Sequence, residues 1–129
     1  MPDKLQEYLD SVRDVPYVWA SHDCAMFSAK WKRFELGIDR FVSAILAHGC
    51  DSALKFRRLT QRRSLLLLTE DVLGPSVTGT PERGDVVLLQ YQGVSALGIA
   101  APPVVLYAGP NGTEACALSF VTHFWRVTE

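Results

Sequence analysis

The sequence has no long apolar run, no linker and no sign of a secretory leader. Its purely apolar stretches, such as residues 65–68, are far too short to cross a bilayer. Four acidic residues fall within the first twenty positions, which is atypical of a secretory signal, so we expect a product made soluble in the cytoplasm. No stretch rich in Pro, Gly or Ser divides the chain. We therefore expect one domain over residues 1–129, long enough to bury a single core.

Cysteine is scarce and has no spacing typical of a metal site. The three cysteines form no C-x-x-C pair and are an odd number, so they predict neither a disulfide framework nor a zinc site. We expect no metal and no cofactor. Cys50 and Cys116 lie among apolar or small residues and are expected to be buried thiols. Cys24 differs, because its local sequence is of a kind that lowers a thiol pKa.

Net charge is also small. With 13 basic and 14 acidic residues the chain carries a formal charge of −1, which argues against a general nucleic-acid binder. One segment departs from this balance, with five basic residues and no acid within nine positions: Lys55, Arg57, Arg58, Arg62 and Arg63. The segment is either a docking patch for an acidic protein surface or a phosphate, or a solvated helix face whose acidic neighbours are supplied by the fold.

Apolar periodicity predicts helices in the first part of the chain. Spacings of three and four are typical of one helix face, and they recur in five segments. We expect helices over residues 3–13, 23–36, 41–48, 51–56 and 64–73, with a short extended segment at 15–21.

The second part of the chain is β-prone. Residues 86–91 are a continuous apolar run of the kind found in a buried strand, and turn signals such as Pro110-Asn111-Gly112 separate the runs that follow. The expected strands are 86–91, 95–100, 104–108, 113–118 and 124–127. Helices (1–76) followed by strands (82–129) predict an α+β fold, in which N-terminal helices pack on a small antiparallel sheet.

The most distinctive stretch is residues 16–24, Pro-Tyr-Val-Trp-Ala-Ser-His-Asp-Cys. It places Cys24 at a predicted helix start, where the helix dipole and unpaired N–H groups favour thiolate. Asp23 either tunes that thiol or simply caps the helix, and capping alone accounts for an aspartate there.

These motifs resemble those of a known group of enzymes. An Asp-Cys pair at the head of a helix, followed by helices and then by Arg83-Gly84-Asp85-Val86 opening a small sheet, resembles the NlpC-like cell-wall cysteine peptidases of papain-like fold. The whole chain looks most similar to a compact phage family encoded among tail genes. That likeness includes residues 19–24, 37–39, 83–89, 96–99 and 125–127.

The resemblance implies a base that the sequence lacks. In the peptidases a histidine opens the second strand in a His-hydrophobe-Gly pattern and takes the thiol proton. The matching triplet here begins with Ala96. His22, two residues before Cys24, is expected to point away from the helix start, and His48 and His123 are expected at a helix end and a strand edge. None has the placement that the mechanism requires.

We therefore expect a structural component of a bacteriophage or phage-like tail, at the tail tip or baseplate, with Cys24 a vestigial nucleophile. Its partners would be other tail proteins, with the basic segment or the Pro102-Pro103 loop as contact surface, and its location the virion tail. The alternatives are an active cysteine peptidase or amidase acting on peptidoglycan during DNA entry, with His22 or His123 recruited as base, and a tail assembly factor absent from the finished particle.

Overall fold

The computed structural model describes residues 3–127, so the outermost residues of the predicted 1–129 domain, 1–2 and 128–129, lie outside it. Within the described range the chain forms five α-helices and then five strands. The helices are α1 (Lys4–Val12), α2 (Cys24–Leu36), α3 (Arg40–His48), α4 (Ala53–Arg62) and α5 (Leu65–Leu73). The strands are β1 (Val86–Tyr91), β2 (Val94–Ala101), β3 (Val104–Gly109), β4 (Gly112–Ala117) and β5 (Val121–Trp125), with a short 3-10 helix η1 (Leu118–Phe120) before β5. The predicted α+β arrangement is confirmed.

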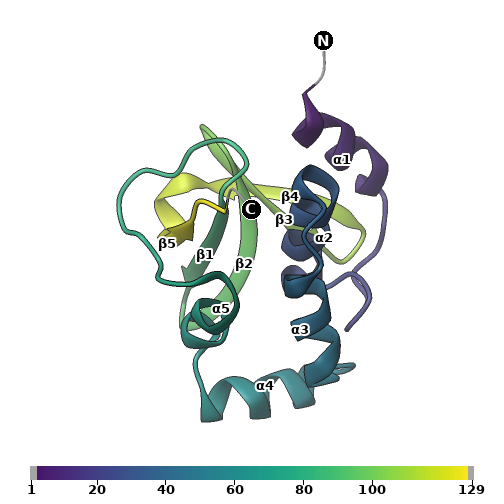
Figure 1. Cartoon of the computed structure of the whole chain (residues 1–129), viewed down its shortest axis with the longest axis vertical. Helices are drawn as coiled ribbons and strands as arrows, with labels where there is room; N and C mark the ends of the chain where they lie inside the picture. Colours follow the sequence, from purple (N-terminus) through teal and green to yellow (C-terminus); the bar gives the residue numbers. More distant parts are fainter. Residues whose placement is uncertain (1–2, 128–129) are drawn as a thin grey trace.

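The strands form one antiparallel sheet in the order β4-β3-β2-β1-β5. Strand β2 pairs with β1 along residues 94–99 but with β3 at residues 99–101, so among the described strands its first half has one neighbour. The sheet is therefore open between the start of β2 and the end of β3. In Figure 1, α1, α2 and α3 lie along one side of the sheet, while α4 crosses the bottom of the view towards α5.

Helix α2 is the element on which the sheet packs. Phe27 and Trp31 are fully buried on its inner face, and the Trp31 Nε1–H donates a hydrogen bond of 2.8 Å to the Gly84 carbonyl just before β1. Gly84 has a φ of +92°, and a Cβ there would lie 3.4 Å from the Trp31 ring. The positive φ is the reason that glycine is favoured at this position, since the Cβ contact itself would be an ordinary one. As predicted, Gly37 ends the helix in a left-handed conformation.

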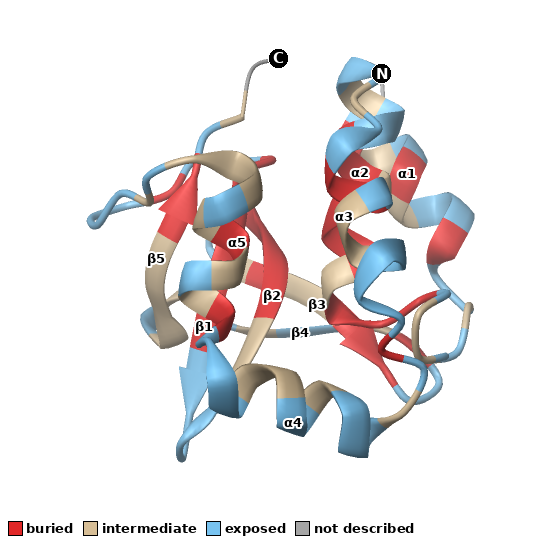
Figure 2. Ribbon diagram, turned by 60° about the horizontal axis from the view of Figure 1, so that its bottom comes forward, coloured by how far each residue is buried: buried red, intermediate tan, exposed pale blue. Residues whose placement is uncertain are grey.

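The sheet buries side chains on both of its faces. Val86, Leu88 and Leu97 pack towards the helices, against a cluster that includes Met26 and Phe41. The opposite face carries a second cluster, formed by Val87, Leu89, Ala100, Val105 and Phe124. Figure 2 shows the buried positions concentrated in α2 and the central strands. Since successive residues of a strand point to opposite faces, these clusters fix which side of β2 each residue occupies.

Helix α4 is longer than predicted. The expected segment 51–56 was too short, because the helix extends to Arg62, and its cap is the Ser52 hydroxyl, which accepts a 3.2 Å hydrogen bond from the Lys55 N–H. No residue of α4 is buried, and Phe56 and Leu59 are its half-buried apolar residues. Arginine and glutamine are good helix formers, so the helix continues without the apolar periodicity on which the prediction relied.

Two extended segments also differ from prediction. The extended segment predicted at 15–21 ends in a turn at residues 18–22: the His22 N–H donates to the Val18 carbonyl at 2.7 Å, and Ala20 has a φ of 66°. The last strand spans Val121–Trp125 rather than 124–127, because η1 turns the chain and a bulge opposite Leu88 and Leu89 shifts the register. None of the helices in the described range is both apolar enough and long enough to cross a membrane.

The Trp31–Gly84 hydrogen bond gives a test of how α2 is held to the sheet. We expect Trp31→Phe to lower the free energy of unfolding by about 1–3 kcal/mol, because the buried Gly84 carbonyl loses its donor and the smaller ring leaves a gap. Urea unfolding measures the change. The control Tyr91→Phe removes a hydroxyl from a residue that is 57% exposed and should change the free energy by less than about 0.5 kcal/mol. Equal losses of stability in Trp31→Phe and Tyr91→Phe would show that the Trp31–Gly84 hydrogen bond does not hold α2 to the sheet.

Candidate functional site

Asp23 sets the position of Cys24. One Asp23 carboxylate oxygen accepts the Met26 N–H at 2.8 Å, and the other accepts the Ala20 N–H at 3.0 Å. The first bond caps α2, as the sequence predicted, and the second ties down the turn that leads into the helix. Cys24, the first helical residue, is therefore fixed from both sides.

The Cys24 thiol is buried rather than activated. Only 7% of the residue is exposed, and burial raises the thiol pKa to about 11. Polar groups near the sulfur, on the Leu97 backbone, the Tyr17 side chain and the Ala25 backbone, act to lower this pKa, but they do not outweigh burial. The expectation that the helix start lowers this pKa was wrong, because it took no account of desolvation by the sheet packed against the sulfur.

Tyr17 occupies the space beside the thiol, a role that the sequence prediction missed. Burial, followed by the neighbouring Cys24, raises the pKa of the Tyr17 phenol, and a phenol that keeps its proton cannot accept one from a thiol. The ring also packs edge-on against Trp19 at 5.1 Å between centroids, and Trp19 packs against Phe56 of α4 at 5.4 Å. The alternation of Tyr17 and Trp19 was the available signal, but it did not indicate which one contacts Cys24.

His22 lies in the interior, contrary to the prediction that it points away from the helix start. It is 2% exposed, its ring packs edge-on against Phe27 at 5.8 Å between centroids, and neither ring nitrogen has a hydrogen-bond partner in the structure. A base must lie within hydrogen-bond reach of the proton it takes. His22 makes no such contact with the Cys24 sulfur.

The start of β2 provides no base either. The register pairs Leu88 with Leu97 and Leu89 with Ala96, so Leu97 faces the helices and Ala96 faces the other side of the sheet. Ser95 is the residue of this segment that shares the helix-facing side, and its hydroxyl accepts a 3.2 Å hydrogen bond from Gln90. Neither a methyl group nor a serine hydroxyl accepts a thiol proton near neutral pH.

An open groove runs past Cys24, between α4 and the start of β2. Its volume of about 630 Å³ is in the range of small-molecule and peptide sites. The groove is lined by Tyr17, Trp19, Cys24, Ala53, Phe56, Arg57, Thr60, Ser64, Leu65, Gly93, Val94, Ser95, Ala96, Tyr107 and Ala108. This lining contains one cation, Arg57, no acid and no histidine. It can hold a chain segment, but it lacks the second group that hydrolysis by a cysteine requires.

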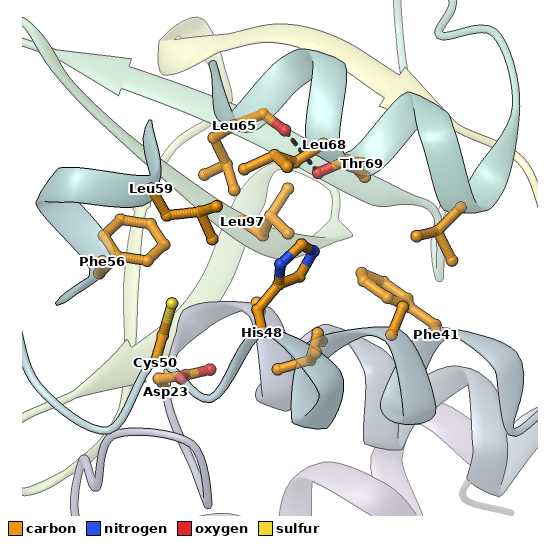
Figure 3. A pocket seen from close by; sticks show the side chains of 14 residues that line it. Asp23, Phe41, His48, Cys50, Phe56, Leu59, Leu65, Leu68, Thr69 and Leu97 are labelled. Atoms are coloured by element: carbon orange, nitrogen blue, oxygen red, sulfur yellow. Dashed lines mark hydrogen bonds between the residues drawn. The ribbon is translucent and has the colours of Figure 1, made fainter. Parts of the chain in front are cut away.

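A second cavity lies nearby, between α3, α5 and β2. Figure 3 shows His48, Cys50 and Asp23 on one side of it, with Phe56, Leu65 and Leu97 among the apolar residues of its walls. Its volume of about 50 Å³ is too small for a metabolite. We therefore place the candidate site at the Cys24 groove.

With the fold and groove described, the chain can be placed among known families. Residues 1–127 match the family model described as Domain of unknown function (DUF6950). The chain belongs to the DUF6950 family. No curated protein and no solved structure matches it.

The basic segment of this DUF6950 chain is divided by the fold. Lys55 pairs with Asp51 and Arg63 pairs with Asp71, each at 2.8 Å. Arg57 lines the Cys24 groove. Arg58 and Arg62 instead line a separate recess. The five residues predicted as one docking patch thus do not form a single surface.

The remaining titratable groups form no metal site. Within residues 3–127, no group of three or more His, Cys, Asp or Glu side chains is placed to hold an ion. His123 lies in β5, where its Nδ1 is 3.1 Å from the Thr122 hydroxyl. Neither His123 nor His48 is among the residues that line the groove.

Burial of His22 predicts a pH dependence of stability. Desolvation is the main cause that lowers the pKa of His22 in the folded state, and the positive charge of Lys30 lowers it further. The negative charge of Asp23 partly opposes both effects. The unfolded chain therefore binds more protons, and the contribution of His22 to stability is present above its unfolded pKa and lost as pH falls below it. We expect the free energy of unfolding to decrease between roughly pH 7 and pH 5. In His22→Leu the free energy of unfolding, measured by urea unfolding at each pH, should change less steeply with pH in this window. An unchanged slope would contradict the assignment of the pH dependence to His22.

Proposed function

We propose that this chain is a structural component of a bacteriophage or phage-like tail, at the tail tip or baseplate, with an NlpC-like scaffold that lacks hydrolase activity. The phage context is supported by the resemblance of residues 19–24, 83–89 and 96–99 to a family encoded among tail genes. The absence of hydrolysis is supported by the site itself. On this proposal the chain contributes a shape and a groove to an assembly rather than a reaction.

One observation carries the absence of hydrolysis: within residues 3–127, no base is placed beside the Cys24 thiol. Cysteine hydrolases need a thiolate and a partner that returns the proton to the leaving amine. Here the thiol pKa is raised to about 11, and none of the residues that line the groove is a histidine. A thiol that titrates near 11 is only about one ten-thousandth ionised at pH 7, and each pH unit between pKa and pH lowers that fraction tenfold.

The contact surfaces for other tail proteins are the groove and the exposed turn between β2 and β3. Pro102 and Pro103 are exposed at that turn. Trp19 and Phe56 give the groove an aromatic wall, and large aromatic side chains are favoured at protein interfaces. These features suit a domain that holds an extended segment of a neighbour.

A second function is favoured by one feature, the position of Cys24 on the lining of an open groove. That position suits an active peptidase or amidase acting on peptidoglycan during DNA entry, provided that His22 or His123 moves to the sulfur. A tail assembly factor is the third possibility. Mass spectrometry of washed particles separates it from a structural component, because an assembly factor is absent from the finished tail.

The ionisation of Cys24 can be tested by alkylation. We expect iodoacetamide to modify Cys24 more slowly than free cysteine at pH 6 to 9, because the thiolate fraction is small and the sulfur is buried. Peptide mass spectrometry distinguishes Cys24 from Cys50 and Cys116 in the same sample. Half-buried Cys116 serves as an internal reference, and Cys24 should react more slowly than it does. Accelerated modification of Cys24 at pH 6 would contradict the proposal.

Hydrolysis can be tested directly. We expect no release of peptides from purified peptidoglycan by the intact chain, and no difference between the wild type and Cys24→Ala. Chromatography of the soluble products measures this. Release of peptides that disappears in Cys24→Ala would establish the peptidase alternative instead.

A further inference from the structure

A basic recess distinct from the Cys24 groove lies between α4 and the end of α3. Its volume is about 210 Å³. It is lined by His48, Cys50, Lys55, Arg58, Leu59 and Arg62. His48 comes from the end of α3, and Cys50 from the connection to α4. The lining thus combines four basic side chains with one thiol and one leucine, and it includes no carboxylate.

Helical spacing brings the α4 residues of the recess together. Lys55, Arg58 and Arg62 are three and four positions apart, so they project from one side of the helix. Like charges at this spacing repel one another. The Asp51 carboxylate offsets one of them through its 2.8 Å ion pair with Lys55. Arg58 and Arg62 form no ion pair with any residue in the range 3–127.

Some exposed cations outside the recess have an acidic partner, whereas others, such as Arg33 and Arg40, have none among the described residues. Arg63 pairs with Asp71, Arg83 with Asp3 at 2.7 Å, and Arg126 contacts Asp85 at 3.0 Å. For Arg83 and Arg126 the partner comes from a distant part of the chain, whereas Asp71 lies eight residues after Arg63. The recess differs in that two neighbouring guanidinium groups, those of Arg58 and Arg62, line it together and neither forms an ion pair within the described chain.

We propose that this recess, which we call the Arg58–Arg62 recess, binds the carboxylates of an acidic segment of a partner protein. Guanidinium groups form paired hydrogen bonds with carboxylates. Leu54 is 53% exposed and lies four residues before Arg58, so an apolar contact is available beside the charges. A net charge of −1 and this mixed surface favour an acidic protein segment over nucleic acid. The inference does not depend on the state of Cys24 or on the phage context.

The test measures binding of the intact chain to a fluorescein-labelled peptide of alternating glutamate and leucine, by fluorescence anisotropy at about 50 mM salt, where surface charges are weakly screened. We expect the double variant Arg58→Glu and Arg62→Glu to bind at least about tenfold more weakly than the wild type. The matched control is Arg33→Glu with Arg40→Glu, which makes the same change in net charge at exposed positions on α2 and α3. The control should lose less than about twofold, because exposed charges away from the site contribute mainly through screened long-range attraction.

Two further probes define the ligand. A peptide of alternating glutamine and leucine should bind at least about tenfold more weakly than the acidic peptide, since it offers no carboxylate. A single-stranded oligonucleotide and inorganic phosphate are the competing anions. Equal loss in both double variants would overturn the proposal, and so would tighter binding of the oligonucleotide or of phosphate than of the acidic peptide. Because this measurement uses the isolated chain, its failure would leave the results for peptidoglycan and for tail particles unaffected.

Discussion

The Asp23 carboxylate is the constraint on which the rest of the site depends. By accepting the Met26 N–H and the Ala20 N–H it joins the start of α2 to the preceding turn, which includes a non-glycine residue with positive φ. Such a conformation costs of order 1–3 kcal/mol and persists only where its surroundings hold it. The same two bonds fix the Cys24 sulfur against the Leu97 backbone and the Tyr17 hydroxyl.

The neighbours brought together in this way stabilise a buried thiol more than a reactive one. Burial raises the pKa of Cys24, Tyr17 keeps its proton, and His22 is enclosed beside Phe27 without a hydrogen bond. A cysteine hydrolase would have an imidazole at the start of β2. This chain has the Leu97 backbone, the Ala96 methyl group and the Ser95 hydroxyl there. The groove nevertheless stays open, with the aromatic side chains of the turn and α4 on its walls. The geometry of the groove therefore supports a binding role. The basic residues of α4 add to this, because Arg57 lines the groove and Arg58 and Arg62 line a second recess.

The fold could be predicted further from the sequence than the site. Apolar periodicity and turn residues gave the order of elements, the limits of β1 and the ends of α2, because those signals are local. The length of α4 could not be predicted in this way, since its continuation rests on helix propensity with few apolar residues. The raised pKa of Cys24 reflects burial beside Leu97 of β2, some seventy residues later in the chain, and the burial of His22 beside Phe27 is likewise a tertiary feature that local patterns do not indicate. Ala96 was predicted from a sequence pattern to stand at the base position, whereas the register of β1 and β2 places it on the face away from the helices.

The central claim is that Cys24 remains a protonated thiol in a site without a base. The most direct measurement is a titration of the Cys24 Cβ resonance by nuclear magnetic resonance, with carbon-13-labelled cysteine in the intact chain and assignment through Cys24→Ala. The account predicts no shift through the neutral range and a midpoint near pH 11. A midpoint below about 7, the range of activated cysteines, accompanied by titration of the His22 ring at the same pH, would show a coupled thiolate and imidazolium and contradict the account.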